Sequence, residues 1–163
     1  MALTGKQLVN GIWINPSVES STFQAINPAD NTRLPTNFTN ATETEVETAA
    51  LEASKSFVEY SAMSEQQRAG FLEAIAIELE QLKSIIIARC MLETGLLEAR
   101  LQGEMGRTTG QLRMFARLLE SGDWKRVVID TADPEREPVP KPDIRLTQIP
   151  LGPVVVFAAS NFP

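Results

Sequence analysis

The spacing of hydrophobic and polar residues changes several times along this chain. Near the N-terminus, apolar and polar residues alternate in two short runs, around residues 12–14 and 22–26, and asparagine–proline pairs interrupt both runs. Alternation with a period of two predicts β-strands. We therefore expect these two runs to pair as a two-stranded ribbon, with a third short strand over residues 33–38.

From residue 42 onward the spacing predicts four helices. Thr42 with Glu45, and Ser64 with Gln67, form capping boxes that begin the first two helices. A third helix is predicted from about Ile85 to Thr94, with a glycine placed to end it. The apolar face of the first helix consists of Val46, Ala49, Ala50, Ala53 and Phe57.

The fourth predicted helix is long, from about Leu97 to Glu120. Three glycines interrupt an otherwise good helix-forming sequence, and we interpret them as places where another helix or strand approaches closely. They are Gly103, Gly106 and Gly110.

The C-terminal third returns to strand patterns. A strand is predicted over 126–130, a proline-rich connector follows, and residues 143–149 alternate as a strand with one solvated face would. The continuous apolar run that follows Gly152-Pro153 is typical of a parallel strand buried on both faces. Such a strand needs neighbours on both edges, and nothing after Pro163 supplies them, so we expect an α/β fold that is truncated.

Composition excludes several classes of function. The chain has 163 residues, enough for one domain with a core, and a net charge of −6 that disfavours binding to nucleic acid. No apolar run is long enough to span a bilayer and no secretory signal is visible, so we expect no membrane partner and a cytoplasmic location. The chain lacks histidine, which excludes histidine-based catalysis and most zinc sites. Its one cysteine, Cys90, lies in an apolar stretch that indicates packing.

The end of the chain carries a family resemblance. The Gly152-Pro153 strand followed by Asn161-Phe162-Pro163 resembles the start of the cofactor-binding domain in NAD(P)-dependent aldehyde dehydrogenases, and the resemblance covers the whole chain. Segments 93–96, 98–104 and 106–112 look like the α-ketoglutaric semialdehyde (2,5-dioxovalerate) dehydrogenases, which usually use NADP, whereas Leu97 stands where that subfamily usually has proline.

The resemblance implies a division into three parts. Residues 1–125 would form the ribbon and helices of the cofactor-binding domain, and residues 126–149 would form oligomerisation-type strands. Residues 150–163 would form the first strand of a Rossmann-like parallel sheet and the Asn-Phe-Pro motif.

The implied reaction is the oxidation of a small aldehyde, α-ketoglutaric semialdehyde, to 2-oxoglutarate through a cysteine thiohemiacetal. The cofactor would be NADP or NAD, and the full-length protein would form a homodimer or homotetramer. The family's nucleophilic cysteine and general-base glutamate match nothing in this chain, so we expect the chain alone to be inactive. Two alternatives remain: a non-catalytic chain that associates with other subunits through its strands, and an unrelated helical module.

The resemblance also assigns candidate site residues. Asn161 would stabilise the oxyanion of the tetrahedral adduct; alternatively it ends a strand in a turn. Residues 157–161 (Phe157, Ala158, Ala159, Ser160 and Asn161) would line the nicotinamide-ribose side of the cofactor, or form a strand end without a ligand. Ala158 replaces the glycine usual in that subfamily and adds a methyl group near the cofactor's path. Arg107 would hold a distal substrate carboxylate; alternatively it is a solvated helix arginine.

Overall fold

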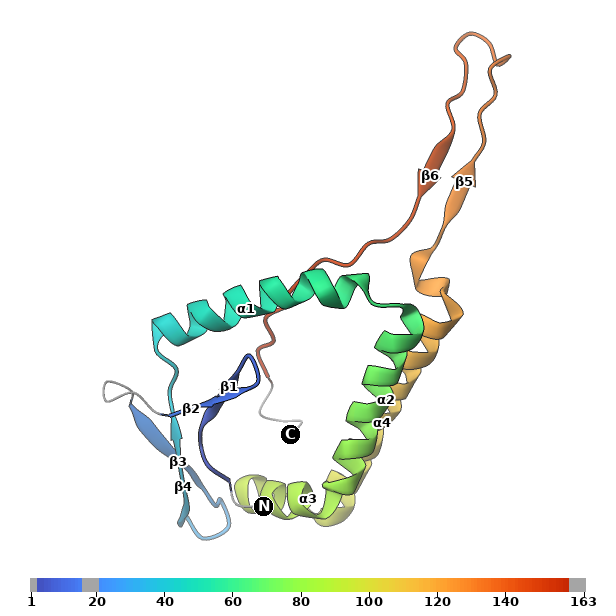
Figure 1. The fold of residues 1–163 in the computed structure, drawn as a ribbon. Helices are drawn as coiled ribbons and strands as arrows, with labels where there is room; N and C mark the ends of the chain where they lie inside the picture. Colours follow the sequence, from blue (N-terminus) through green and yellow to red (C-terminus); the bar gives the residue numbers. More distant parts are fainter. Residues whose placement is uncertain (1–2, 16–20, 159–163) are drawn as a thin grey trace.

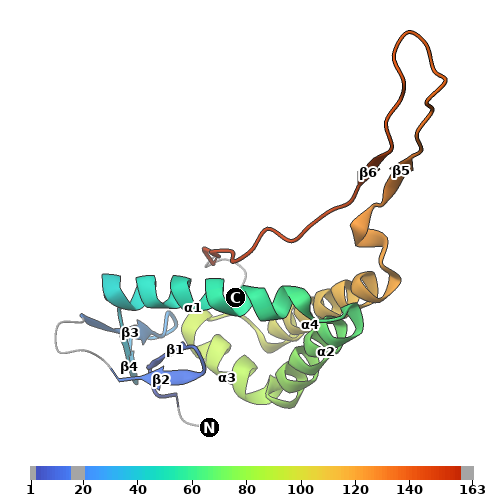
Figure 2. The ribbon, with the colours of Figure 1, turned by 45° about the horizontal axis from the view of Figure 1, so that its top comes forward.

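The computed structural model describes residues 3–15 and 21–158 of the chain. The described residues form two N-terminal β-hairpins, four α-helices and a third hairpin, which projects from the rest of the molecule (Figure 1). Helices α2 (Glu65–Gln81) and α4 (Glu98–Ser121) lie side by side, and α1 (Glu43–Ala62) and α3 (Lys83–Thr94) extend from opposite ends of this pair (Figures 1 and 2). The four helices and the third hairpin thus follow the order predicted from the sequence.

The N-terminal strands pair differently from the prediction. β1 (Gln7–Val9) pairs with β2 (Ile12–Ile14), and β3 (Thr22–Ile26) pairs with β4 (Arg33–Thr39), both antiparallel. The expected ribbon of residues 12–14 with 22–26 is therefore wrong, whereas the third strand is confirmed. The cause is the Asn10-Gly11 turn, where φ is 50° and 73°, because this dipeptide favours a tight two-residue hairpin.

One glycine allows the first hairpin to lie against the second. Gly5 has a φ of +68°, and a Cβ atom built on it would lie 1.8 Å from the carbonyl oxygen of Asn37 in β4. No side chain fits in that space, so the residue at position 5 must be glycine for this approach. The side-chain amide of Gln7 donates to the Thr39 carbonyl at 3.1 Å and holds the same contact.

The four helices begin and end close to the predicted residues. Both capping boxes are present, and the left-handed residue after the third helix is the expected glycine, at φ 69°. The largest difference is the start of the third helix, two residues earlier than predicted. The bounds are α1 Glu43–Ala62, α2 Glu65–Gln81, α3 Lys83–Thr94 and α4 Glu98–Ser121.

Small side chains form the contact between α2 and α4. Ala69 and Ala76 of α2 are fully buried, and Ala116 and Thr109 of α4 are nearly so. Alanines at this contact allow the two helix backbones to pack closely. The glycines of α4 were expected to allow close approach of another helix or strand, and among the described residues that expectation is wrong. A Cβ atom on any of the three would meet nothing within 4 Å among the described residues.

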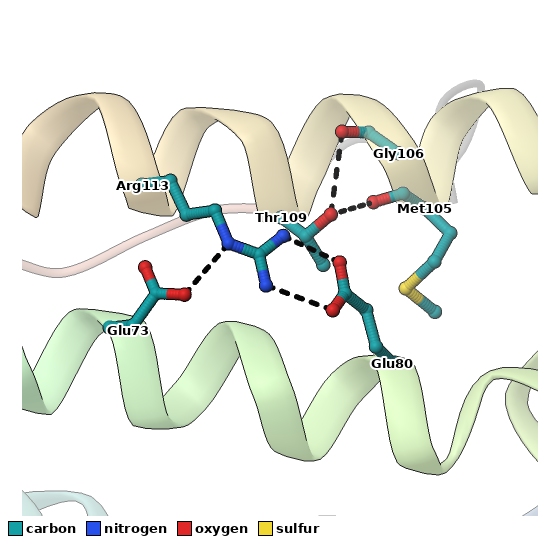
Figure 3. A network of polar contacts seen from close by, with 6 residues as sticks. All are labelled: Glu73, Glu80, Met105, Gly106, Thr109 and Arg113. Carbon is teal, nitrogen blue, oxygen red and sulfur yellow. Dashed lines mark hydrogen bonds and ion pairs between the residues drawn. The ribbon is translucent and has the colours of Figure 1, made fainter.

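A cluster of charged side chains lies at the solvent-exposed edge of the same contact. The guanidinium of Arg113 on α4 binds Glu80 on α2 through two bonds, of 2.6 Å and 2.9 Å, and its Nε donates to Glu73 at 2.8 Å (Figure 3). Glu73 and Glu80 are two helical turns apart, so both carboxylates lie on the face of α2 that meets α4. The buried hydroxyl of Thr109 donates back to the Met105 carbonyl at 3.2 Å.

This cluster predicts a dependence of stability on pH. The hydrogen bond from Arg113 holds the pKa of Glu80 below its ordinary value of 4.5. A carboxyl whose pKa is lower in the folded state stabilises the fold above its ordinary pKa, and this contribution is lost as pH falls through the lowered value. We expect Arg113→Met to lower the midpoint of thermal unfolding clearly at pH 7 and much less at pH 3. Arg117→Met, at an exposed position of the same helix, is the control and should show no such difference.

The third hairpin is solvent-exposed along both strands. After the short 3-10 helix η1 (Asp123–Lys125), β5 (Val128–Asp130) pairs antiparallel with β6 (Ile144–Leu146), which confirms the two predicted strands over shorter ranges. Every residue of these strands is exposed. The proline-rich connector between them forms the far end of the hairpin, away from the helices (Figure 2).

The last described segment does not form the expected buried strand. Residues 151–158 belong to no strand, and Val155 and Phe157 are 78% and 93% exposed. A strand buried on both faces needs hydrogen-bonded neighbours on both edges, and the described residues provide none. For the same reason the core is smaller than the length of the chain predicts. Among the described residues, no large side chain is fully buried.

Candidate functional site

The C-terminal segment returns from the third hairpin to α1. In both views the chain leaves β6 and runs back beside α1 (Figures 1 and 2). Gly152, Pro153 and Val154 line a shallow hollow together with α1, whose lining residues are Ala53, Ser56, Phe57 and Tyr60. Ala53 and Phe57, two members of the predicted apolar face of α1, therefore line the hollow in which the C-terminal segment begins.

A glycine turns the chain at this hollow. Gly152 has a φ of +113° and open space around its Cα, and only glycine adopts this conformation without strain. Local backbone geometry, rather than crowding, therefore requires glycine at this position. The turn sends the apolar run past α1.

Two of the five predicted cofactor residues lie within the described part of the chain. Phe157 and Ala158 are both exposed, and no strand covers their backbone. The role of Phe157 and Ala158 in binding the cofactor therefore stays a prediction. Ala159, Ser160 and Asn161 lie outside the described residues.

Arg107 lies on α4 and is exposed. It lies nearly half a turn from Thr109, which faces α2, so its side chain projects from the opposite side of the helix. Within the described residues its guanidinium takes part in no ion pair, whereas that of Arg113 binds two carboxylates. Arg107 therefore has a charge available for a ligand or for solvent.

Cys90 has the properties of a packing residue. It is half-buried on α3, and burial raises the pKa of its thiol, which the nearby charge of Glu93 raises further. A thiol with a raised pKa is protonated at neutral pH and is a poor nucleophile. Its surroundings are mainly aliphatic side chains of α2, α3 and α4: Leu79, Ile86, Ile87 and Leu101.

The described ranges contain no group of three histidine, cysteine, aspartate or glutamate residues that could hold a metal ion. Likewise, no helix in the described part of the chain is long and apolar enough to cross a bilayer.

Comparison with known proteins gives consistent results at the level of sequence. The model of the aldehyde dehydrogenase family matches residues 13–163. An α-ketoglutaric semialdehyde dehydrogenase of Acinetobacter baylyi is 47% identical over 159 residues, which cover 98% of this chain and 30% of that protein. A second protein of that name, α-ketoglutaric semialdehyde dehydrogenase 2 of Azospirillum brasilense, is 44% identical and is covered to 31%. The chain thus spans about a third of the length of these relatives.

Solved structures show the same fold. The NAD-dependent benzaldehyde dehydrogenase of Corynebacterium glutamicum matches 79% of this chain with a TM-score of 0.70 at 20% identity, over 27% of that chain. A betaine aldehyde dehydrogenase of Staphylococcus aureus in complex with NAD+ matches 82% of this chain with a TM-score of 0.71 at 21% identity, over 26% of that chain. Together, the family match, the relatives and the fold establish that this chain belongs to the aldehyde dehydrogenase family.

Proposed function

We propose that the chain forms the N-terminal part of an enzyme that oxidises α-ketoglutaric semialdehyde to 2-oxoglutarate with NADP+ or NAD+ as the acceptor. One observation carries the proposal: two dehydrogenases named for this substrate are 47% and 44% identical over nearly the whole chain. The bound nicotinamide would accept a hydride from the substrate. The nucleophilic cysteine and the general base would come from parts of the protein beyond this sequence.

In this proposal the C-terminal segment has two roles. Phe157, Ala158, Ala159 and Ser160 hold the nicotinamide-ribose side of the cofactor, chiefly through backbone groups. Asn161 donates its side-chain amide to the oxygen that becomes an anion when the aldehyde carbon turns tetrahedral. A donor aimed at that oxygen stabilises the transition state more than the substrate, because the charge develops only there.

The test is an assay of the full-length protein with both cofactors. α-Ketoglutaric semialdehyde is compared with pentanal, which has the same number of carbons and no carboxylate. A clear preference for the acidic aldehyde in kcat/KM supports the proposal, and the two cofactors are compared in the same way. Equal kcat/KM values for the two aldehydes would contradict the assigned substrate but leave the family assignment intact.

Arg107 is the proposed contact for the distal carboxylate of the substrate, because its charge has no acidic partner in the described part of the chain. We expect Arg107→Met in the full-length protein to raise KM for the acidic aldehyde by roughly tenfold or more and to leave KM for pentanal unchanged. Arg107→Lys keeps the charge, so its KM for the acidic aldehyde should lie between those of the unmodified protein and Arg107→Met. Arg117→Met should leave both KM values unchanged. An equal rise of KM for both aldehydes would refute this role.

The proposal has a second feature, which is that the exposed third hairpin associates with further copies of the chain. Val128, Ile129, Ile144 and Leu146 are each more than half exposed, and unpaired strand edges readily pair with other strands. In the full-length protein we expect these strands to lie in a subunit interface of a homodimer or homotetramer. Size-exclusion chromatography with light scattering tests this, and a monomer would exclude it.

A further inference from the structure

The base of the third hairpin carries a cluster of side chains that joins it to the start of α2. Lys125 is the last residue of η1, and its Nζ lies 2.5 Å from Oε1 of Glu65, the first residue of α2. The pKa of Glu65 is below its ordinary value, first because of the hydrogen bond from Lys125 and further because of the charge of Arg68. The ion pair therefore connects the helical part of the fold to the start of the hairpin.

Trp124 completes this cluster. The guanidinium carbon of Arg68 lies 5.5 Å from the centre of the Trp124 ring, and Nζ of Lys125 lies 5.9 Å from it. Both distances are within the range of cation–π attraction. The half-buried indole thus stands beside two cations, one from α2 and one from the junction itself, and Glu65 balances part of their charge.

The backbone of Lys125 also holds the returning strand. Its carbonyl oxygen accepts a hydrogen bond from the amide of Gln148 at 2.9 Å and another from the hydroxyl of Thr147 at 3.2 Å. One residue therefore contacts α2 through its side chain and the chain after β6 through its carbonyl. The next residue, Arg126, has a φ of 43°, a left-handed conformation that redirects the chain into β5.

We propose that Lys125 is the anchor that sets the direction of the β5–β6 hairpin relative to α2 and α4. The strands themselves are exposed at every position, and in Figures 1 and 2 the hairpin projects from the helices and meets them only at its base. We therefore take the base as the place that decides its direction. Lys125 is a positioning residue. It fixes the angle at which the hairpin presents its apolar side chains to the neighbouring subunit of the proposed homo-oligomer.

The experiment is hydrogen exchange of the full-length protein followed by mass spectrometry. Lys125→Met is compared with Lys141→Met, because Lys141 pairs with Asp130 inside the hairpin rather than at its base. In Lys125→Met we expect exchange about fivefold faster over residues 126–130 and 144–148, with α2 and α4 unchanged. Lys141→Met should affect only Asp130 and the distal part of the hairpin beyond it, and should leave residues 126–128 and 146–148 unchanged. All variants are compared at one oligomeric state, checked by size-exclusion chromatography.

Two further variants separate an anchor from general stabilisation. Lys125→Arg keeps the cation and should restore slow exchange, whereas Glu65→Gln removes the partner charge and should accelerate the same two segments. Unchanged exchange in Lys125→Met or in Glu65→Gln would overturn the proposal. So would an acceleration spread evenly over α2 and α4. The readout does not depend on which aldehyde the protein oxidises.

Discussion

In the full-length protein, replacing Asn161 with alanine is expected to lower kcat for aldehyde oxidation by about 10²- to 10³-fold. The physical reason is that, in the proposed role, the substitution removes a donor that is oriented before the charge forms on the oxygen. Removing such a donor costs about 2.7–4 kcal/mol in the transition state and little in the bound substrate. KM should therefore change little. The measurement is the initial rate of NAD(P)H formation with α-ketoglutaric semialdehyde.

The alternative for Asn161 is a residue that simply ends a strand in a turn, and it predicts a different result. In that case Asn161→Ala would lower the midpoint of thermal unfolding and leave kcat unchanged. Asn37→Ala is the matched control, because Asn37 is exposed on β4 and should affect neither quantity. A rise in KM at constant kcat would show that the amide binds the ground state and transition state equally, contrary to the proposed role.

The largest expected effect on stability comes from Ala76→Leu. Ala76 is fully buried between α2 and α4, and the longer side chain would force two closely packed helices apart. Overpacking of this kind costs about 1–3 kcal/mol. The measurement is the midpoint of thermal unfolding followed by circular dichroism.

Ala74→Leu provides the control for this change. Ala74 lies on the same helix, two residues earlier, and is exposed. Leucine is nearly as good a helix former as alanine, so Ala74→Leu should leave the midpoint nearly unchanged. If both variants unfold at the same temperature, the α2–α4 contact is looser than the burial of Ala76 indicates.

The sequence was sufficient for features that depend on neighbouring residues. The capping boxes of α1 and α2 and the glycine end of α3 lie at their predicted places. Each depends on hydrogen bonds and dihedral preferences within a few residues. The two strands of the third hairpin also lie near their predicted places, because alternation of apolar and polar residues marks a strand before its partner is known. The family motif at the end of the chain is likewise readable without coordinates, and it is the source of the candidate site residues.

Some local signals were present but were interpreted incorrectly or not used. Asn10-Gly11 marks a hairpin on its own and would have predicted the pairing of β1 with β2. The seven-residue spacing of Glu73 and Glu80 places both on one face of α2, beside the alanines that share it. This pattern pointed to a cationic partner, although it did not say that Arg113 would be that partner.

The tertiary structure decided what depends on residues far apart in the chain. It placed alanines rather than the glycines of α4 at the helix contact, brought Lys125 to Glu65, and left the apolar run after Gly152 exposed. Hydrophobicity and small size tell which residues are able to be buried, but burial also requires a surface that covers them. A sequence pattern describes one side of a contact, and only the folded chain supplies the other.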